Sequence, residues 1–205
     1  MGSADGDCSG FSDERPQHKV RVKPFLLCRT EVTQAAWEAL MGSNPSNRKG
    51  PSLPVEEVSW TDAQEWCRKA GLRLPTEAEW EYACRAGTTS RFCLGDEDGE
   101  LSNYAWYGGN SYFQAHPVGQ KRPNAFGLYD MPGNVWEWCE DTWHGDYSGA
   151  PTDGSVWLGG SSNRVNRGGS WNSDPGDYRS ATRLRCDPGI RALSLLGFRP
   201  SSRSL

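Results

Sequence analysis

The sequence contains no run of about 18 apolar residues, so no segment is long enough to cross a membrane as a helix. Its first residues, MGSADGDCSGFSDERPQ, are polar and lack the apolar stretch of a secretion signal. We therefore expect no insertion into a membrane and a cytoplasmic location, unless a longer N-terminus precedes Met1. No CxxC pair occurs either, which argues against a zinc site.

Cysteine and histidine are too scattered to indicate a reaction. The seven cysteines are odd in number, and reduced, mostly buried thiols are the expected state. One or two disulfides stay open as an alternative if the protein is exported. The histidines show no metal-binding spacing and number only three: His18, His116 and His144.

Hydrophobic residues make up only 36% of the 205 residues, yet the chain has 10 Trp, 24 Gly and 13 Pro. This composition indicates a core built on a few large aromatic side chains, with much of the chain in turns and loops. The net charge of −4 gives no general attraction to nucleic acid.

Local patterns place helices early in the chain and strands mainly late. Three helices are predicted, each with a threonine N-cap and a glycine stop, at residues 33–42, 61–71 and 76–87. Strands are predicted at residues 18–28, 55–60 and 127–143. No linker interrupts these patterns, so we expect a single α+β domain over residues 1–205.

Four phrases resemble one known family: EVTQAAWEAL, PVEEVSWTDAQEWCRKAGLRLPTEAEWEYACRAG, NAFGLYDMPGNVWEW and the pair RGGSW…LGFR. They are similar to the formylglycine-generating enzyme (sulfatase-modifying factor) domain, and the resemblance covers nearly the whole chain. It implies a C-type lectin fold of the formylglycine-generating-enzyme type, with small antiparallel sheets, flanking helices and much loop.

The resemblance fails at the residues that carry the family's oxidation chemistry. In the founding enzyme, two cysteines five residues apart hold copper, and thiolates suit Cu(I). This chain has Ser173 and Tyr178 at the corresponding positions, and Cys186 is its only cysteine after Cys139. We therefore expect that the chain is not an enzyme. A formylglycine-generating copper oxidase, a related enzyme or a pseudoenzyme is the alternative.

A calcium site of the family carries over in part. The resemblance implies oxygen ligands from the side chains of Asp130 and Glu137 and from the carbonyls of Gly133 and Val135. The alternative is that the two carboxylates satisfy backbone donors in a tight turn. A structural calcium ion is thus the one cofactor that the resemblance suggests, and none is required for binding.

The composition changes sharply after residue 158. Residues 159–205 contain no Lys, Glu, Gln, Met or His, whereas the first 158 residues contain 29 of them. At that density about nine would be expected in the last 47 residues. The charge changes as well, because this segment has 8 Arg against 3 Asp while the rest has 14 basic and 23 acidic residues.

The irregular positions between RGGSW and LGFR share one property, which is that each can be encoded by an NNC codon. This pattern resembles the variable region, here about residues 163–199, of a diversity-generating retroelement variable protein. In such systems a reverse transcriptase mutates the adenines of a template and rewrites the target gene. The predicted ligand-binding residues are Asn166, Asn172, Ser173, Asp174, Gly176, Asp177, Tyr178, Ser180, Thr182, Leu184, Cys186, Ile190, Ala192, Leu193 and Ser194.

Residues 178–186 alternate between permissive even positions and odd positions that include Arg179 and Arg183. In a strand this would place the variable side chains on one face and the arginines against buried carbonyls or acids. We therefore expect that replacing Tyr178 and Leu184 together by alanine leaves folding intact. An ordinary amphipathic strand is the alternative, but it does not explain the change in composition.

Together these patterns predict a ligand-binding, receptor-like protein with a diversified C-terminal surface. The mixture of Tyr, Ser, Asn, Gly and Asp with a few aliphatic side chains suits a protein partner. We expect the chain to be a monomer.

Overall fold

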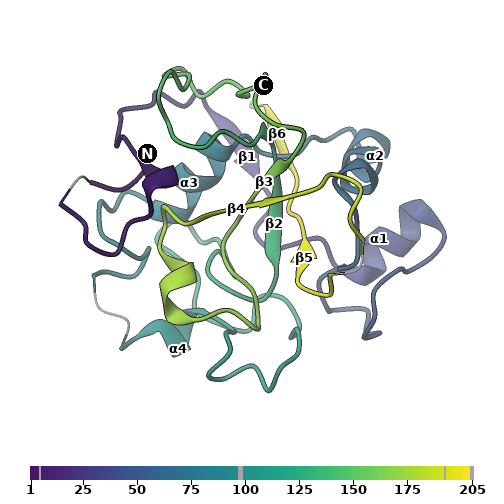
Figure 1. Ribbon diagram of the computed structural model, residues 1–205. Coiled ribbons are helices and arrows are strands. Elements are labelled where there is room, and N and C mark those ends of the chain that lie inside the picture. Colours follow the sequence, from purple (N-terminus) through teal and green to yellow (C-terminus); the bar gives the residue numbers. More distant parts are fainter. Residues whose placement is uncertain (5, 97–98, 192, 204–205) are drawn as a thin grey trace.

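The computed structural model describes residues 1–4, 6–96, 99–191 and 193–203 (Figure 1). The helices and strands are short. Long loops connect them, as the composition predicted. In chain order the elements are η1 (Ser12–Glu14), β1 (Phe25–Leu27), α1 (Gln34–Met41), α2 (Trp60–Ala70), α3 (Glu77–Arg85), α4 (Leu101–Tyr104), β2 (Trp136–Thr142), β3 (Arg164–Arg167), η2 (Pro175–Tyr178), β4 (Arg183–Cys186), β5 (Leu196–Gly197) and β6 (Ser201–Arg203). Within the described ranges, every helix is too short or too polar to cross a bilayer.

Helices α3 and α2 begin at reciprocal side-chain caps, whereas at α1 only the predicted Thr33 hydroxyl accepts a hydrogen bond, from the Ala36 amide. The Thr76 hydroxyl accepts a hydrogen bond from the Glu79 amide, and the Glu79 carboxylate accepts one from the Thr76 amide, as predicted. The same arrangement joins Ser59 and Asp62 at the start of α2. The predicted cap of α2, Thr61, is therefore wrong by two residues, because Asp62 reaches back to Ser59.

The three strands predicted at residues 18–28, 55–60 and 127–143 differ from the observed ones, and the last is shortened to β2, Trp136–Thr142. Within residues 18–28 only β1 forms a strand, which pairs with β6 from Phe25–Arg203 to Leu27–Ser201. Residues 55–60 form no strand. The Val55 amide instead donates a single hydrogen bond to the Val32 carbonyl, at 2.8 Å.

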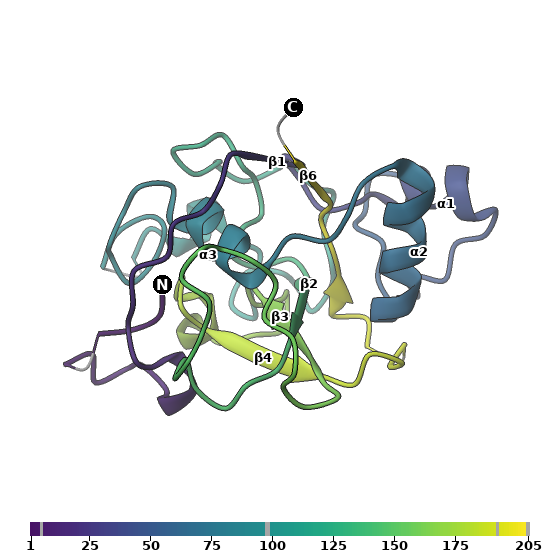
Figure 2. The same ribbon diagram turned by 90° about the horizontal axis from the view of Figure 1, so that it is seen from above.

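A four-stranded sheet with the order β4-β3-β2-β5 forms the centre of the molecule, and a separate pair, β1 and β6, joins the two ends of the chain. β2, β3 and β4 are antiparallel neighbours, whereas β5 runs parallel to β2. Viewed from above in Figure 2, α1 and α2 stand together on one side of the molecule, and α3 packs against β2 and β3.

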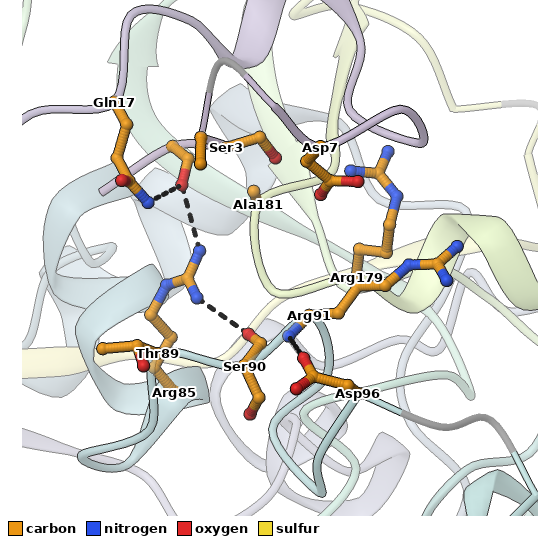
Figure 3. A pocket seen from close by; sticks show the side chains of 12 residues that line it. Ser3, Asp7, Gln17, Arg85, Thr89, Ser90, Arg91, Asp96, Arg179 and Ala181 are labelled. Carbon is orange, nitrogen blue, oxygen red and sulfur yellow. Dashed lines mark hydrogen bonds between the residues drawn. The ribbon is translucent and has the colours of Figure 1, made fainter.

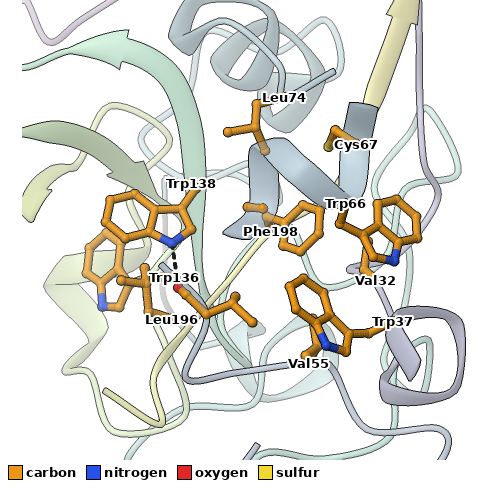
Figure 4. Packing of buried hydrophobic residues seen from close by; sticks show 12 residues of the cluster. Val32, Trp37, Val55, Trp66, Cys67, Leu74, Trp136, Trp138, Leu196 and Phe198 are labelled. Atoms are coloured by element: carbon orange, nitrogen blue, oxygen red, sulfur yellow. Dashed lines mark hydrogen bonds between the residues drawn. The ribbon is translucent and has the colours of Figure 1, made fainter. Parts of the chain in front are cut away.

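The main core lies between the sheet and helices α1 and α2 (Figure 4). Trp37 and Trp66 pack edge-on against the Phe198 ring, with ring centroids 6.1 and 5.6 Å away. Trp138 lies on the inner strand β2 and is fully buried. Its indole nitrogen donates to the Val58 carbonyl at 3.0 Å. A few large aromatic side chains thus supply most of this core, as the composition predicted.

Buried Arg–Glu pairs join the C-terminal segment to the rest of the chain. Arg199 is fully buried and contacts the Glu137 carboxylate at 2.7 Å. Its remaining donors reach the carbonyls of Cys28, Arg29, Tyr129 and Asp130. This single guanidinium therefore connects the approach to α1, the turn before β2, the β2 strand and the C-terminal end.

Three further pairs follow the same rule. Arg179 binds Glu14 at 2.5 Å, Arg183 binds Glu77 at 2.6 Å, and Arg167 binds Glu81. Each arginine belongs to the basic last segment and each glutamate to the acidic remainder. The charge contrast seen in the sequence is thus matched by ion pairs inside the fold, and the predicted burial of Arg179 and Arg183 against acids is confirmed.

Asp141 on β2 links two separate segments from a buried position. Its carboxylate accepts hydrogen bonds from the backbone amides of Glu77, at 2.8 Å, and Trp157, at 2.9 Å. Burial raises the pKa of Asp141 from 3.8 to about 7, and the neighbouring Glu77 carboxylate adds to the effect. Between these values the folded protein keeps a proton that the unfolded chain releases.

We predict that the Asp141 carboxyl group makes the free energy of unfolding fall as the pH rises from about 4 to about 7. The sign follows because the folded pKa is raised, so folding takes up a proton in that range. Urea unfolding of the wild type and of Asp141→Asn, followed by tryptophan fluorescence, isolates the contribution of Asp141. The difference between the two proteins should change steadily through the range, and parallel curves would contradict the prediction.

Candidate functional site

The segment between RGGSW and LGFR crosses the sheet and then returns to it. It runs from β3 through the loop containing η2, back along β4, and around a second loop to β5 (Figure 1). The two glycines of the phrase RGGSW have no room for a Cβ atom. Gly168 and Gly169 have φ angles of 102° and 77°, and a Cβ atom at Gly169 would lie 2.5 Å from the Tyr178 ring.

Five of the predicted ligand-binding side chains are buried, which corrects the prediction that they face outward. Tyr178 is 2% exposed, and its hydroxyl donates to the carbonyls of Ser170 and Ser173 at 2.6 and 3.0 Å. Burial raises the pKa of this hydroxyl. The other buried members are Asn166, Ser173, Ser180 and Thr182.

The predicted strand over residues 178–186 is wrong for a physical reason. Residues up to Tyr178 form the 3-10 helix η2, and only Arg183–Cys186 form a strand. Between them the Arg167 guanidinium donates to three successive carbonyls, from Ser180 to Thr182. This segment wraps around a buried cation instead of pairing with β3, so side-chain alternation applies only to Leu184 and Cys186.

The remaining predicted residues do lie at or near the surface, and we call them the variable surface. They comprise four exposed residues, Asn172, Asp174, Gly176 and Leu184, and five half-buried ones, Asp177, Cys186, Ile190, Leu193 and Ser194. The Trp171 indole nitrogen donates to the Ser194 carbonyl at 2.9 Å, which holds the two loops of this surface together. Ala192 lies outside the described residues.

The sheet contributes one edge of the variable surface. Asn166 pairs with Leu184 and Arg164 with Cys186, so these four side chains share a face of β3 and β4. Ile190 and Leu193 pack beside Cys186 against the main core. Within the described part of the chain, neither polar atom of the Asn166 amide has a hydrogen-bond partner. Sequence reasoning gave no sign that Asn166 is fully buried beneath this face.

A hollow of about 480 Å³ lies beside the other end of the segment, between the N-terminal residues and the loop after α3 (Figure 3). Arg85 and Arg179 line it, but their guanidinium groups are already paired with Glu81 and Glu14. Within residues 163–199 only Arg179 and Ala181 line this hollow. The hollow is therefore separate from the variable surface.

Three of the predicted calcium ligands, Asp130, Gly133 and Val135, lie on the turn that leads into β2, and Glu137 lies on β2 itself. Both oxygens of Glu137 are engaged, because Arg199 and the Trp80 indole nitrogen donate to them. Asp130 has one oxygen bonded to the Gly119 amide at 2.6 Å and one buried oxygen without a partner among the described residues. Gly133 must be glycine, since a Cβ atom there would lie 2.4 Å from the Trp106 carbonyl oxygen.

Glu31 was not recognised from the sequence, although it joins the same group. It is buried, one of its oxygens has no partner among the described residues, and the other accepts from the Asn134 amide nitrogen at 3.2 Å. Burial, with the nearby carboxylates of Asp130 and Glu137, raises its pKa well above the usual range. Two carboxylate oxygens of this buried group thus lack a partner, although the described residues contain no cluster of three or more Asp, Glu, His or Cys side chains placed to hold a metal ion.

The matching family model is the "Sulfatase-modifying factor enzyme 1-like domain", which covers residues 1–202. The chain belongs to this family. A formylglycine-generating enzyme of Streptomyces coelicolor is 38% identical over 97% of this chain and 84% of its own length.

Two solved structures share the fold over almost the whole chain. Variable protein 1 of Treponema denticola has a TM-score of 0.89 and 34% identity, covering 99% of this chain and 91% of its own. PvdO from Pseudomonas aeruginosa has a TM-score of 0.89 and 32% identity, covering 100% and 90%. These likenesses confirm the predicted C-type lectin fold of the formylglycine-generating-enzyme type and the resemblance to a retroelement variable protein.

The relatives correct one prediction from the sequence. The expectation that the chain is not an enzyme is wrong as a firm exclusion. Formylglycine-generating enzymes from several organisms are 36% to 42% identical to the chain. The expectation rested on Ser173 and Tyr178 alone. In the structure, the Tyr178 hydroxyl holds the turn at Ser170–Ser173, which is a structural role that sequence comparison could not assign.

We predict losses of stability of very different size for the two residues that the alternating pattern had grouped together. Tyr178→Ala removes a buried ring and two hydrogen bonds, so it should lower the free energy of unfolding by about 3–5 kcal/mol. Leu184 is 38% exposed, and Leu184→Ala should cost about 1 kcal/mol or less. Urea unfolding of the two single variants measures both values. Equal, small effects would restore the original prediction.

Proposed function

We propose that this protein binds other proteins through the variable surface and that retroelement-directed mutation diversifies that surface. The observation that carries the proposal is the absence of Lys, Glu, Gln and Met from residues 159–205, combined with the likeness to a variable protein at 34% identity. His is also absent there, but NNC codons allow it. The missing residues are those that an adenine-mutated AAC template cannot encode.

The packing of the segment supports such a use. Its arginines at positions 167, 179, 183 and 199 are buried in ion pairs, so the framework does not depend on the exposed side chains between them. Exposed loop positions on a rigid scaffold accept substitution with little effect on stability. A surface that mixes Asn, Asp, Ser and Gly with Leu184, Ile190 and Leu193 offers adaptable hydrogen bonds around a small apolar centre, which suits a protein partner.

The gene tests this proposal directly. We predict that DNA encoding residues 163–199, sequenced across a cell population, carries NNC codons that differ between cells at the variable surface. A near-copy with AAC at those sites and a reverse-transcriptase gene should lie close by. Substitutions at Tyr178 should be rarer in functional copies, because that ring is buried. An invariant segment without a template copy would refute the proposal and direct attention to copper-dependent oxidation of a cysteine peptide.

We also propose that Asp130, Glu31 and the Gly133 and Val135 carbonyls hold a structural calcium ion next to the Glu137–Arg199 pair. A bound cation would offset the mutual repulsion of the buried carboxylates at the turn before β2. This ion would stiffen the turn and would take no part in ligand contact.

Calcium should therefore raise the melting temperature of the protein, and EDTA should reverse the rise. Asp130→Asn should abolish the response, whereas Glu38→Gln, which removes an exposed acid on α1, should preserve it. Differential scanning fluorimetry measures the shift. The same melting temperature with calcium and with EDTA would show that the turn holds no such ion.

A further inference from the structure

Two neighbouring aromatic side chains project into solvent from the loop between α4 and β2. Tyr112 is 83% exposed and Phe113 is 72% exposed, more than any other large hydrophobic residue described in the structure. Both residues have positive φ angles, 55° and 56°, which residues other than glycine rarely adopt. A surface loop gains nothing for folding from exposed rings on a strained backbone, so the arrangement calls for another explanation.

Hydrogen bonds and ring stacking beneath the two aromatic residues hold the loop in this strained conformation. The buried Ser111 hydroxyl oxygen accepts a hydrogen bond from the Phe113 amide at 3.1 Å, and the Ser111 carbonyl contacts the His116 ring at 2.8 Å. His116 stacks on Trp106 with ring centroids 3.7 Å apart. The two exposed rings therefore sit on a fixed base, which lowers the entropy lost when they enter a contact.

The same base is joined to the start of the variable segment. The Ser111 hydroxyl donates to the Trp171 carbonyl at 2.6 Å, and the Gly108 amide donates to the Ser173 carbonyl at 3.1 Å. Asn172 and Asp174, two exposed members of the variable surface, directly adjoin these anchored residues. The aromatic loop and the variable surface thus form neighbouring parts of one side of the molecule, and the loop itself lies outside residues 163–199.

We propose that Tyr112 and Phe113 are fixed anchors of the partner-binding surface and that the partner is a folded protein with apolar pockets for the two rings. This inference rests on the proposed function and adds to it a part that does not vary. Rigid aromatic side chains supply contact area that small polar residues cannot, and they dominate the energy of many protein interfaces. The variable residues would then select the partner, while the two rings provide affinity common to all of them.

The test uses protein fragments displayed on phage from a genomic library of the cells that carry this gene. Fragments captured by the wild-type protein are purified, and their dissociation constants are measured for each variant. The loop variant is Tyr112→Gly with Phe113→Gly. Because glycine adopts positive φ without strain, this variant should fold with an unchanged or higher melting temperature. Its affinity for the captured fragments should be at least tenfold weaker.

Two matched variants make the result decisive. Tyr82→Ser with Phe126→Ser removes the same two residue types from another surface, where they are 51% and 49% exposed, and it should leave affinity unchanged. Asp174→Arg with Leu184→Arg disrupts the variable surface and should abolish binding. Affinity that survives the loop variant but not the variable-surface variant overturns the anchor role and leaves the proposed function standing.

Other outcomes reach the proposed function itself. Binding that is indifferent to the variable-surface variant refutes the proposed function and, with it, the inference drawn from it. Equal losses from the loop variant and from the Tyr82 and Phe126 variant would show general stickiness of exposed rings and would overturn the anchor role. If the wild-type protein captures no fragment, both proposals fail.

Discussion

Ion pairs buried between the two compositionally different parts of the chain are the constraint on which the structure depends. Isolated charges are very costly inside a protein, so each buried arginine requires its glutamate. Arg199 with Glu137, and Arg183 with Glu77, bring the last segment of the chain onto β2 and α3. Because one partner alone would be left as an uncompensated charge, these pairs fix where the segment lies and in which direction it runs.

This anchoring separates framework from surface within a single segment. Arg167, Phe198 and Arg199 of RGGSW and LGFR are buried and carry the packing, while the exposed residues lie in the loops between the two phrases. Tyr178 belongs to the framework although its position in the chain lies among the irregular residues. Variation at the four exposed residues of the variable surface therefore changes side chains that the core does not use, whereas Cys186, Ile190 and Leu193 also pack against the main core.

The fold is shared with proteins of different printed descriptions, a formylglycine-generating enzyme and a variable protein among them. Fold alone does not decide between binding and catalysis. In this chain the Tyr178 hydroxyl closes the turn Ser170–Ser173 from inside, and exposed residues follow Trp171. The neighbouring loop exposes the aromatic rings of Tyr112 and Phe113 beside the small apolar centre of the variable surface.

The sequence by itself determined the family, the fold class, the capped helix α3 and the boundaries of the irregular segment, because these depend on local patterns and on long ordered motifs. It also indicated that Arg179 and Arg183 would face buried carbonyls or acids. Only the tertiary structure decided which irregular residues face solvent. The Arg167 guanidinium bends residues 180–182 around itself, and η2 carries Tyr178 into the core, so strand alternation could not apply. These effects arise from contacts between residues far apart in the chain, which no local pattern records.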